Sequence, residues 1–156
     1  MKTQKIFKGV SLAGILFWVL GMLFPYIYVE GLVYSYEEKD LQYLSLLKFT
    51  KKRFEYNLDD AGMYTFFMIV LALITLLTLF FILKNKPIGI IICGLINQVF
   101  ILLISSDMKE QKIVADGRYK WHAGYYVHLV GLILLLVGAV GLLIYKSNLV
   151  NSQEVF

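Results

Sequence analysis

The stretch MYTFFMIVLALITLLTLFFIL, residues 63–83, contains 21 consecutive residues without a charged side chain. At a rise of about 1.5 Å per residue, a helix of this length spans the roughly 30 Å hydrocarbon core of a bilayer. Three further runs of 19 to 21 residues share this character, at residues 10–29, 88–106 and 125–145. Because a charge inside a span costs at least about 2.5 kcal/mol, four uncharged runs predict four membrane-spanning helices.

The segments between these runs are too short for a separate soluble domain. They are an outer loop at 30–62, an inner turn at 84–87 and a second outer loop at 107–124, in a chain of 156 residues that is 59% hydrophobic. We therefore expect an all-α integral membrane protein, a left-handed four-helix transmembrane bundle that forms one membrane domain over residues 1–156. The first run lacks a small-residue cleavage site, so we interpret it as an uncleaved first span and not a signal peptide.

The distribution of charge predicts the orientation. The short segments on the terminal side carry one acidic residue, Glu154, and six lysines: Lys2, Lys5, Lys8, Lys84, Lys86 and Lys146. The outer loops carry nine basic and ten acidic residues, so the raw count of Lys and Arg favours the opposite orientation. The bias is strongest for short segments and the first helix, which predicts cytoplasmic N- and C-termini. The ratio of 13 Lys to 2 Arg indicates an AT-rich bacterial genome, hence a bacterial cytoplasmic (inner) membrane.

Glycines recur at a seven-residue spacing in the first and last runs. Gly124, Gly131 and Gly138 share one helix face, and Gly14 and Gly21 share another. Small residues on one face allow two helix backbones to approach closely, as in a left-handed bundle. We predict that these faces pack against neighbouring helices of the bundle. The alternative is a glycine face that binds another protein or a second copy of the chain.

Few polar side chains interrupt the spans. Asn97 and Gln98 are intramembrane amides in the third run, and Thr75 and Thr78 lie in the second. An amide in hydrocarbon needs a hydrogen-bonding partner, so we expect Asn97 or Gln98 to bond across to another helix. The indole N–H of Trp18, in the first run, should also seek an acceptor.

The first outer loop contains two structural patterns. Alternating apolar residues over 26–36 predict a short extended ribbon. Ser35 and Glu38 then fit a capping box, and leucines at helical spacing predict a short amphipathic helix over residues 36–49. The basic cluster Lys51, Lys52 and Arg53 follows, either as a solvated turn near lipid headgroups or as a contact for an anionic partner.

The second outer loop contains a hairpin signal, Asp116-Gly117, between short alternating runs. Because a lone two-stranded ribbon is marginal, we expect it to pair with the ribbon of the first loop. The predicted result is a small extracytoplasmic cap of β ribbon and one amphipathic helix. Trp121 and His122 would belong to its possible outer-face contacts.

This layout resembles the claudin-like tetraspan membrane proteins. Their pattern is a long first outer loop, a short inner turn, a shorter second outer loop and outer segments that form sheet. The resemblance covers the whole chain as topology and implies that architecture. The Trp…Gly-Leu-Trp…Cys…Cys motif of the group is missing, and the one cysteine, Cys93, lies in the third run. An adhesion or pore role is therefore not carried over.

The usual catalytic and ligand-binding motifs do not occur in the sequence. It has no phosphate-binding Gly-rich loop, no His-Glu-x-x-His and no Cys-x-x-Cys, and it implies no cofactor and no nucleic-acid partner. His122 and His128 could bind a metal with Asp107 or Asp116, but an interfacial, backbone-bonded histidine fits the spacing better. The pair Asp59-Asp60 suits the N-terminus of the second span better than acid–base chemistry.

We therefore expect a small non-enzymatic bacterial membrane protein that acts through protein or lipid contacts. It would be an accessory subunit, an immunity-type factor or an envelope component, with a protein partner or a second copy of the chain. One alternative is an oligomeric channel or transporter subunit lined by Asn97, Gln98 and the Thr75/Thr78 face. The other is an outer-surface lipid-modifying enzyme that uses His122, His128 and Asp116.

Overall fold

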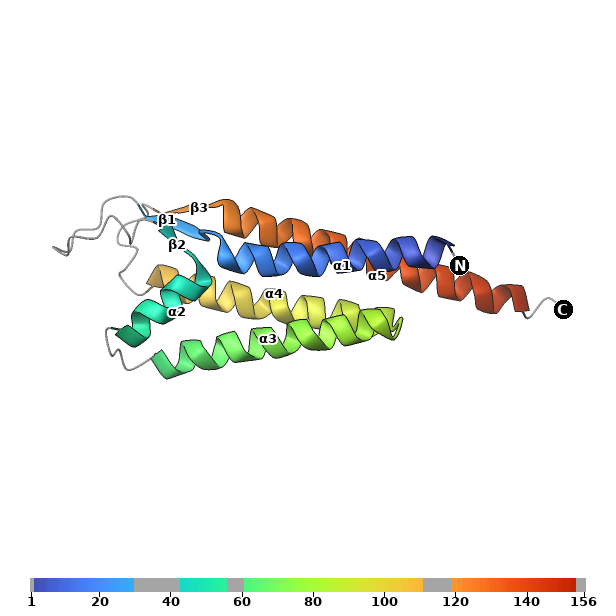
Figure 1. The fold of residues 1–156 in the computed structure, drawn as a ribbon, viewed down its shortest axis with the longest axis horizontal. Coiled ribbons are helices and arrows are strands. Elements are labelled where there is room, and N and C mark those ends of the chain that lie inside the picture. The colour runs from blue at the N-terminus through green and yellow to red at the C-terminus, as the bar shows by residue number, and fades with distance from the viewer. Residues whose placement is uncertain (1, 30–42, 56–60, 111–118, 154–156) are drawn as a thin grey trace.

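Four long helices dominate the computed structural model, which describes residues 2–29, 43–55, 61–110 and 119–153 (Figure 1). They are α1 (Lys2–Leu23), α3 (Ala61–Leu83), α4 (Pro87–Glu110) and α5 (Ala123–Gln153). Each contains a stretch long and apolar enough to cross a membrane, at Lys2–Leu23, Gly62–Leu83, Pro87–Ser106 and Ala123–Asn148. The fold is therefore that of a multi-pass helical membrane protein.

The helices form two pairs. Figure 1 shows α1 beside α5 and α3 beside α4, with the two pairs packed together along their length. A small sheet and a short helix, α2 (Leu46–Glu55), lie at one end, which we call the sheet-bearing end. The N-terminus, the α3–α4 turn and the last turns of α5 lie at the opposite end, which we call the terminal end.

The sheet has three short strands, β1 (Ile27–Val29), β2 (Tyr43–Leu44) and β3 (Tyr119–Trp121), in the order β2-β1-β3. Both pairings are antiparallel: Ile27 lies opposite Leu44 on one side and opposite Trp121 on the other. Tyr26 and Ile27 are fully buried and pack with Leu46 and Tyr64 in the core beneath the sheet. This core joins strand β1 to α2 and α3.

The first predicted span, residues 10–29, differs from α1 at both ends. Helix α1 begins at Lys2 and ends at Leu23, and residues Ile27–Val29 form strand β1. Pro25 explains the early end, because the residue before a proline is pushed out of the helical region. Hydropathy did not reveal this boundary, because the residues of the strand are as apolar as those of the helix.

The amphipathic helix of the first loop also lies elsewhere than predicted. Tyr43 and Leu44 belong to strand β2, and the helix, α2, covers Leu46–Glu55. Ser45 caps it, because the N–H of Lys48 donates to the Ser45 Oγ at 3.1 Å. The basic cluster Lys51–Arg53 is thus part of a helix and not of a turn. The Ser35 capping box, Asp59-Asp60 and Asp116-Gly117 lie outside the described residues.

The turn between α3 and α4 has a defined hydrogen-bond pattern. The N–H of Lys86 donates to the Phe81 carbonyl at 2.9 Å, and the N–H of Asn85 donates to the Ile82 carbonyl at 3.1 Å. Asn85 has φ of 53°, so these bonds form a Schellman motif with Asn85 in the left-handed position. Pro87 then begins α4, because the fixed φ of proline and its missing N–H suit the first helical position.

Replacing Asn85 tests the conformation of this turn. Asn85→Val should lower the free energy of unfolding by about 1–2 kcal/mol, because a β-branched residue is strained at positive φ. Asn85→Gly should leave stability unchanged or slightly raised, because glycine has no Cβ to clash. Thermal unfolding of the purified variants in one detergent measures the difference. Equal melting temperatures for the Val and Gly variants would contradict this backbone conformation.

Candidate functional site

The predicted packing glycines line the contact between α1 and α5, and we call Gly14, Gly21, Gly124, Gly131 and Gly138 the glycine seam. A Cβ added at Gly14 would lie 2.6 Å from the backbone N of Leu135. One added at Gly131 would lie 2.7 Å from the backbone N of Trp18. At both positions any side chain would meet backbone. The two helices therefore lie as close as glycine allows.

The seam continues to both ends of the contact. At the sheet-bearing end the N–H of Gly124 donates to the Pro25 carbonyl at 2.7 Å, and Gly21 faces His128. Toward the terminal end Gly138 faces Ser11. The glycine faces are thus filled within one chain, which leaves no glycine face free for the docking of a partner.

An aromatic cluster closes the sheet-bearing end of the seam. It consists of Trp18, Tyr26, Trp121, Tyr125 and His128. The rings of Trp18 and His128 stack at 5.6 Å, and those of Trp121 and Tyr125 stack at 4.4 Å. Tyr26 meets Trp121, Tyr125 and His128 edge-on, with ring centroids 5.8 to 6.3 Å apart. Tyr26 therefore bridges the two stacks and ties the start of β1 to α5.

Burial changes the acidity of the Tyr26 hydroxyl. The ring is fully buried, and this burial, with a smaller contribution from Tyr125, raises the pKa of Tyr26 well above its ordinary value. The side chain of Ser105 partly offsets the shift. Tyr26 is therefore a neutral, packed side chain at every physiological pH.

The two histidines lie in different surroundings. His128 is only 1% exposed and lies between the rings of Trp18 and Tyr26. His122 precedes α5, and its backbone N–H donates to the Tyr26 carbonyl at 3.0 Å. They do not share an open site, and Asp116 lies outside the described residues. Within the described part of the chain, no three His, Cys, Asp or Glu residues are grouped to hold a metal ion.

The intramembrane polar residues do not share one outward face. Asn97 and Thr78 are fully buried inside the chain, while Gln98 and Thr75 are half-buried. Thr75 and Thr78 donate to the carbonyls four residues earlier, at 2.8 and 2.7 Å. The predicted interhelical bond is not formed among the described residues, because both amide atoms of Asn97 and the Gln98 Oε1 lack partners. The Trp18 indole N–H likewise has no acceptor there.

Helix α2 is the basic element of the sheet-bearing end. Leu46 is 1% exposed and anchors the helix in the core, whereas Leu47 is 48% exposed and Lys51 is exposed. A groove of about 430 Å³ separates α2 from α3. Leu47, Thr50 and Lys51 line one side, and the other side is formed by α3 residues Thr65, Met68, Ile69 and Ala72. Lys52 and Arg53 belong to α2, but the structure does not describe their side chains.

Comparison with protein-family models, curated proteins and solved structures finds no match to this chain. The fold and the arrangement of side chains are therefore the basis for inferring its function.

Substitution of the glycine seam tests the α1–α5 contact. Gly131→Ala should lower the free energy of unfolding by about 1–3 kcal/mol, because the added methyl group overlaps the backbone of Trp18. Gly9→Ala is the matched control in α1, since nothing lies within 4 Å of its added Cβ. The free energy of unfolding of Gly9→Ala should rise by up to about 1 kcal/mol, because alanine has a higher helix propensity than glycine. Unfolding by SDS titration of both variants measures the contrast, and a Gly131→Ala variant as stable as Gly9→Ala would exclude the close contact.

The buried hydroxyl of Tyr26 predicts a loss of stability at high pH. The unfolded chain releases this proton near pH 10, whereas the folded chain retains it. The unfolded state therefore binds fewer protons above about pH 10, and stability falls as the pH rises further. Tyr26→Phe removes this contribution, so the variant should lose less melting temperature than the wild type between about pH 9 and pH 11, which is roughly one unit on either side of the free tyrosine pKa. Identical losses would show that Tyr26 ionises as freely in the fold as in the unfolded chain.

Proposed function

We propose that this protein is a non-enzymatic protein of a bacterial cytoplasmic membrane that acts by binding a protein partner at its sheet-bearing end. An accessory subunit, an immunity-type factor and an envelope component all fit this description. The observation that carries the proposal is the α2–α3 groove, where a basic helix presents an exposed leucine and an exposed lysine together.

The groove has the mixed character of a partner-binding surface. Leu47 and Lys51 are four residues apart and so lie on one face of α2. An apolar anchor beside a positive charge suits a partner with an apolar side chain and an acidic neighbour. Leu46 and the Ser45 cap hold α2 in place, so the surface is formed before the partner binds.

The packing of the polar residues supports a role without chemistry. His128 is covered by aromatic rings, and Tyr26 stays protonated, so neither is available as an acid or base at the surface. Thr78 and Asn97 are buried inside one chain and so do not present a polar face for an oligomeric pore. These positions favour the contact role over the lipid-modifying enzyme and the channel.

The proposed orientation places the sheet-bearing end outside the cytoplasm, as a cap on the outer end of the bundle. The dense lysines of the terminal end support cytoplasmic termini by the positive-inside bias. The seven-residue glycine spacing supports left-handed packing. The claudin-like resemblance agrees with this architecture and supplies no partner.

Site-specific photocrosslinking in living cells tests the proposed function. A photoreactive residue at Leu47 should give a discrete protein adduct, whereas one at Leu76, which is 62% exposed in the middle of α3, should give lipid adducts. Adding Lys51→Glu to the Leu47 probe should reduce the protein adduct several-fold, because it reverses the charge beside the apolar anchor.

Three outcomes would reject the proposal. Lipid adducts alone at Leu47 would mean that α2 serves only as an interfacial anchor. A protein adduct that is unaffected by Lys51→Glu would mean that the partner does not bind in the α2–α3 groove. Ion or solute flux through liposomes containing the purified protein would instead favour the channel.

A further inference from the structure

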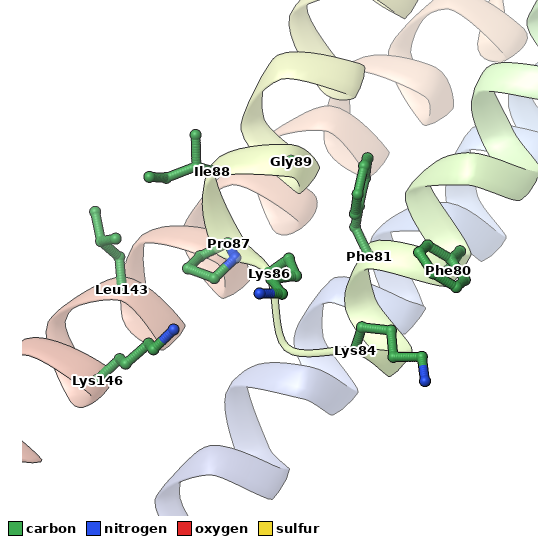
Figure 2. Close-up of a pocket in the computed structure, with 9 residues that line it drawn as sticks. All are labelled: Phe80, Phe81, Lys84, Lys86, Pro87, Ile88, Gly89, Leu143 and Lys146. Carbon is green, nitrogen blue, oxygen red and sulfur yellow. The ribbon is translucent and has the colours of Figure 1, made fainter.

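A second groove lies at the terminal end, between the two helix pairs (Figure 2). It has a volume of about 580 Å³. Phe80 and Phe81 of α3 line one side and Leu143 of α5 the other, with Pro87 and Ile88 at the start of α4 between them. Its wall is therefore apolar and comes from three helices.

The wall opens toward the surroundings and not into the interior of the protein. Ile88 is 62% exposed, Phe80 50% and Leu143 40%. These residues lie at the ends of spans long enough to cross the hydrocarbon core, so lipid surrounds this apolar surface. A groove of this kind accommodates an acyl chain.

Three exposed lysines, Lys84, Lys86 and Lys146, stand at the edge of the same groove. They also line a second hollow of about 300 Å³, together with residues of α1 and α5. Figure 2 shows Lys84 and Lys146 at opposite sides of the groove, with Lys86 on the turn between them. The sequence separates Lys146 from the other two by about 60 residues. Only the packing of α5 beside the α3–α4 turn makes them one cluster.

No carboxylate among the described residues of the terminal end balances these charges, since those of the helices, Glu55, Asp107 and Glu110, lie at the sheet-bearing end. Neither Asp nor Glu occurs within residues 2–29, 61–106 or 119–153. Lys8 adds a further positive charge at this end, where its Nζ donates to the Leu83 carbonyl at 3.1 Å. The groove also contains the first residues of α4, and the free N–H groups of a helix N-terminus add a positive dipole end. The electrostatic field therefore favours an anion at the level of the headgroups.

We infer that this groove binds one anionic glycerophospholipid from the leaflet at the terminal end. Its acyl chain lies along Ile88, Leu143 and Phe80, and its phosphate lies among Lys84, Lys86 and Lys146. A lipid fits better than a soluble anion, because the larger part of the wall is apolar and faces hydrocarbon. The site lies at the other end of the molecule from the α2–α3 groove, so it holds whether or not a protein binds there.

Native mass spectrometry of the full-length protein in mild detergent tests the site, with phosphatidylglycerol compared against phosphatidylcholine. The wild type should retain one phosphatidylglycerol in preference to phosphatidylcholine. The triple variant Lys84→Gln, Lys86→Gln, Lys146→Gln should lose this preference by about 10-fold or more, since each lysine contributes separately. The triple variant Lys2→Gln, Lys5→Gln, Lys120→Gln has the same net charge and should keep this preference.

A second variant tests the apolar part of the groove. Leu143→Trp should reduce retention of both lipids by filling the space beside Ile88, without changing any charge. Circular dichroism and melting temperature verify that each variant is folded. If a triple variant does not fold, its single substitutions are measured in its place. Glycerol 3-phosphate in millimolar excess should fail to displace the lipid, because it lacks the acyl chain.

Several results would overturn the inference. They are a wild type without preference for phosphatidylglycerol, equal losses in the two triple variants, and full displacement by glycerol 3-phosphate. The last result would identify a site for a soluble anion and not for a lipid.

Discussion

The structure depends above all on the direct contact between the backbones of α1 and α5. In a bilayer the hydrophobic effect does not drive two apolar helices together, because lipid tails are as apolar as the side chains. Close packing and backbone contacts must supply the attraction instead. Gly14 and Gly131 allow it, since no side chain separates these helices there, and the Gly124 N–H bonds to the Pro25 carbonyl across the contact. The first and last helices of the chain are thereby joined.

The sheet follows from this contact. Strand β1 begins four residues after α1 ends, and strand β3 ends two residues before α5 begins. Because the glycine seam holds α1 and α5 antiparallel, strands β1 and β3 lie side by side and can pair. Tyr26 then fills the space between the stacked rings of Trp121 and Tyr125 and those of Trp18 and His128. The sheet, the aromatic cluster and the seam are one continuous unit.

The α3–α4 pair is held together by a local turn, and not by a contact between distant parts of the chain as α1 and α5 are. This pair contributes to a different groove at each end of the molecule. Its hairpin is fixed locally by the Schellman motif at Asn85 and by Pro87, and Lys8 links α1 to the last carbonyl of α3. At the sheet-bearing end, α2 packs against α3 and places Lys51 at the edge of the groove between them. At the terminal end, α5 passes the turn and adds Lys146 to its two lysines.

The amino-acid sequence alone determined the number of long helices, the short turn at residues 84–87 and the glycine faces. These depend on local properties: the length of an apolar run, the short segment between two runs and a seven-residue repeat. The sequence misplaced the end of α1 and the position of α2, because apolar strand residues resemble a span and because leucines at helical spacing were partly taken up by strand β2. Only the tertiary structure decided that the two glycine faces meet each other, that Tyr26 and His128 are packed out of reach, and that Lys146 joins Lys84 and Lys86. Those relations connect residues far apart in the chain, and they arise from backbone packing that no local pattern encodes.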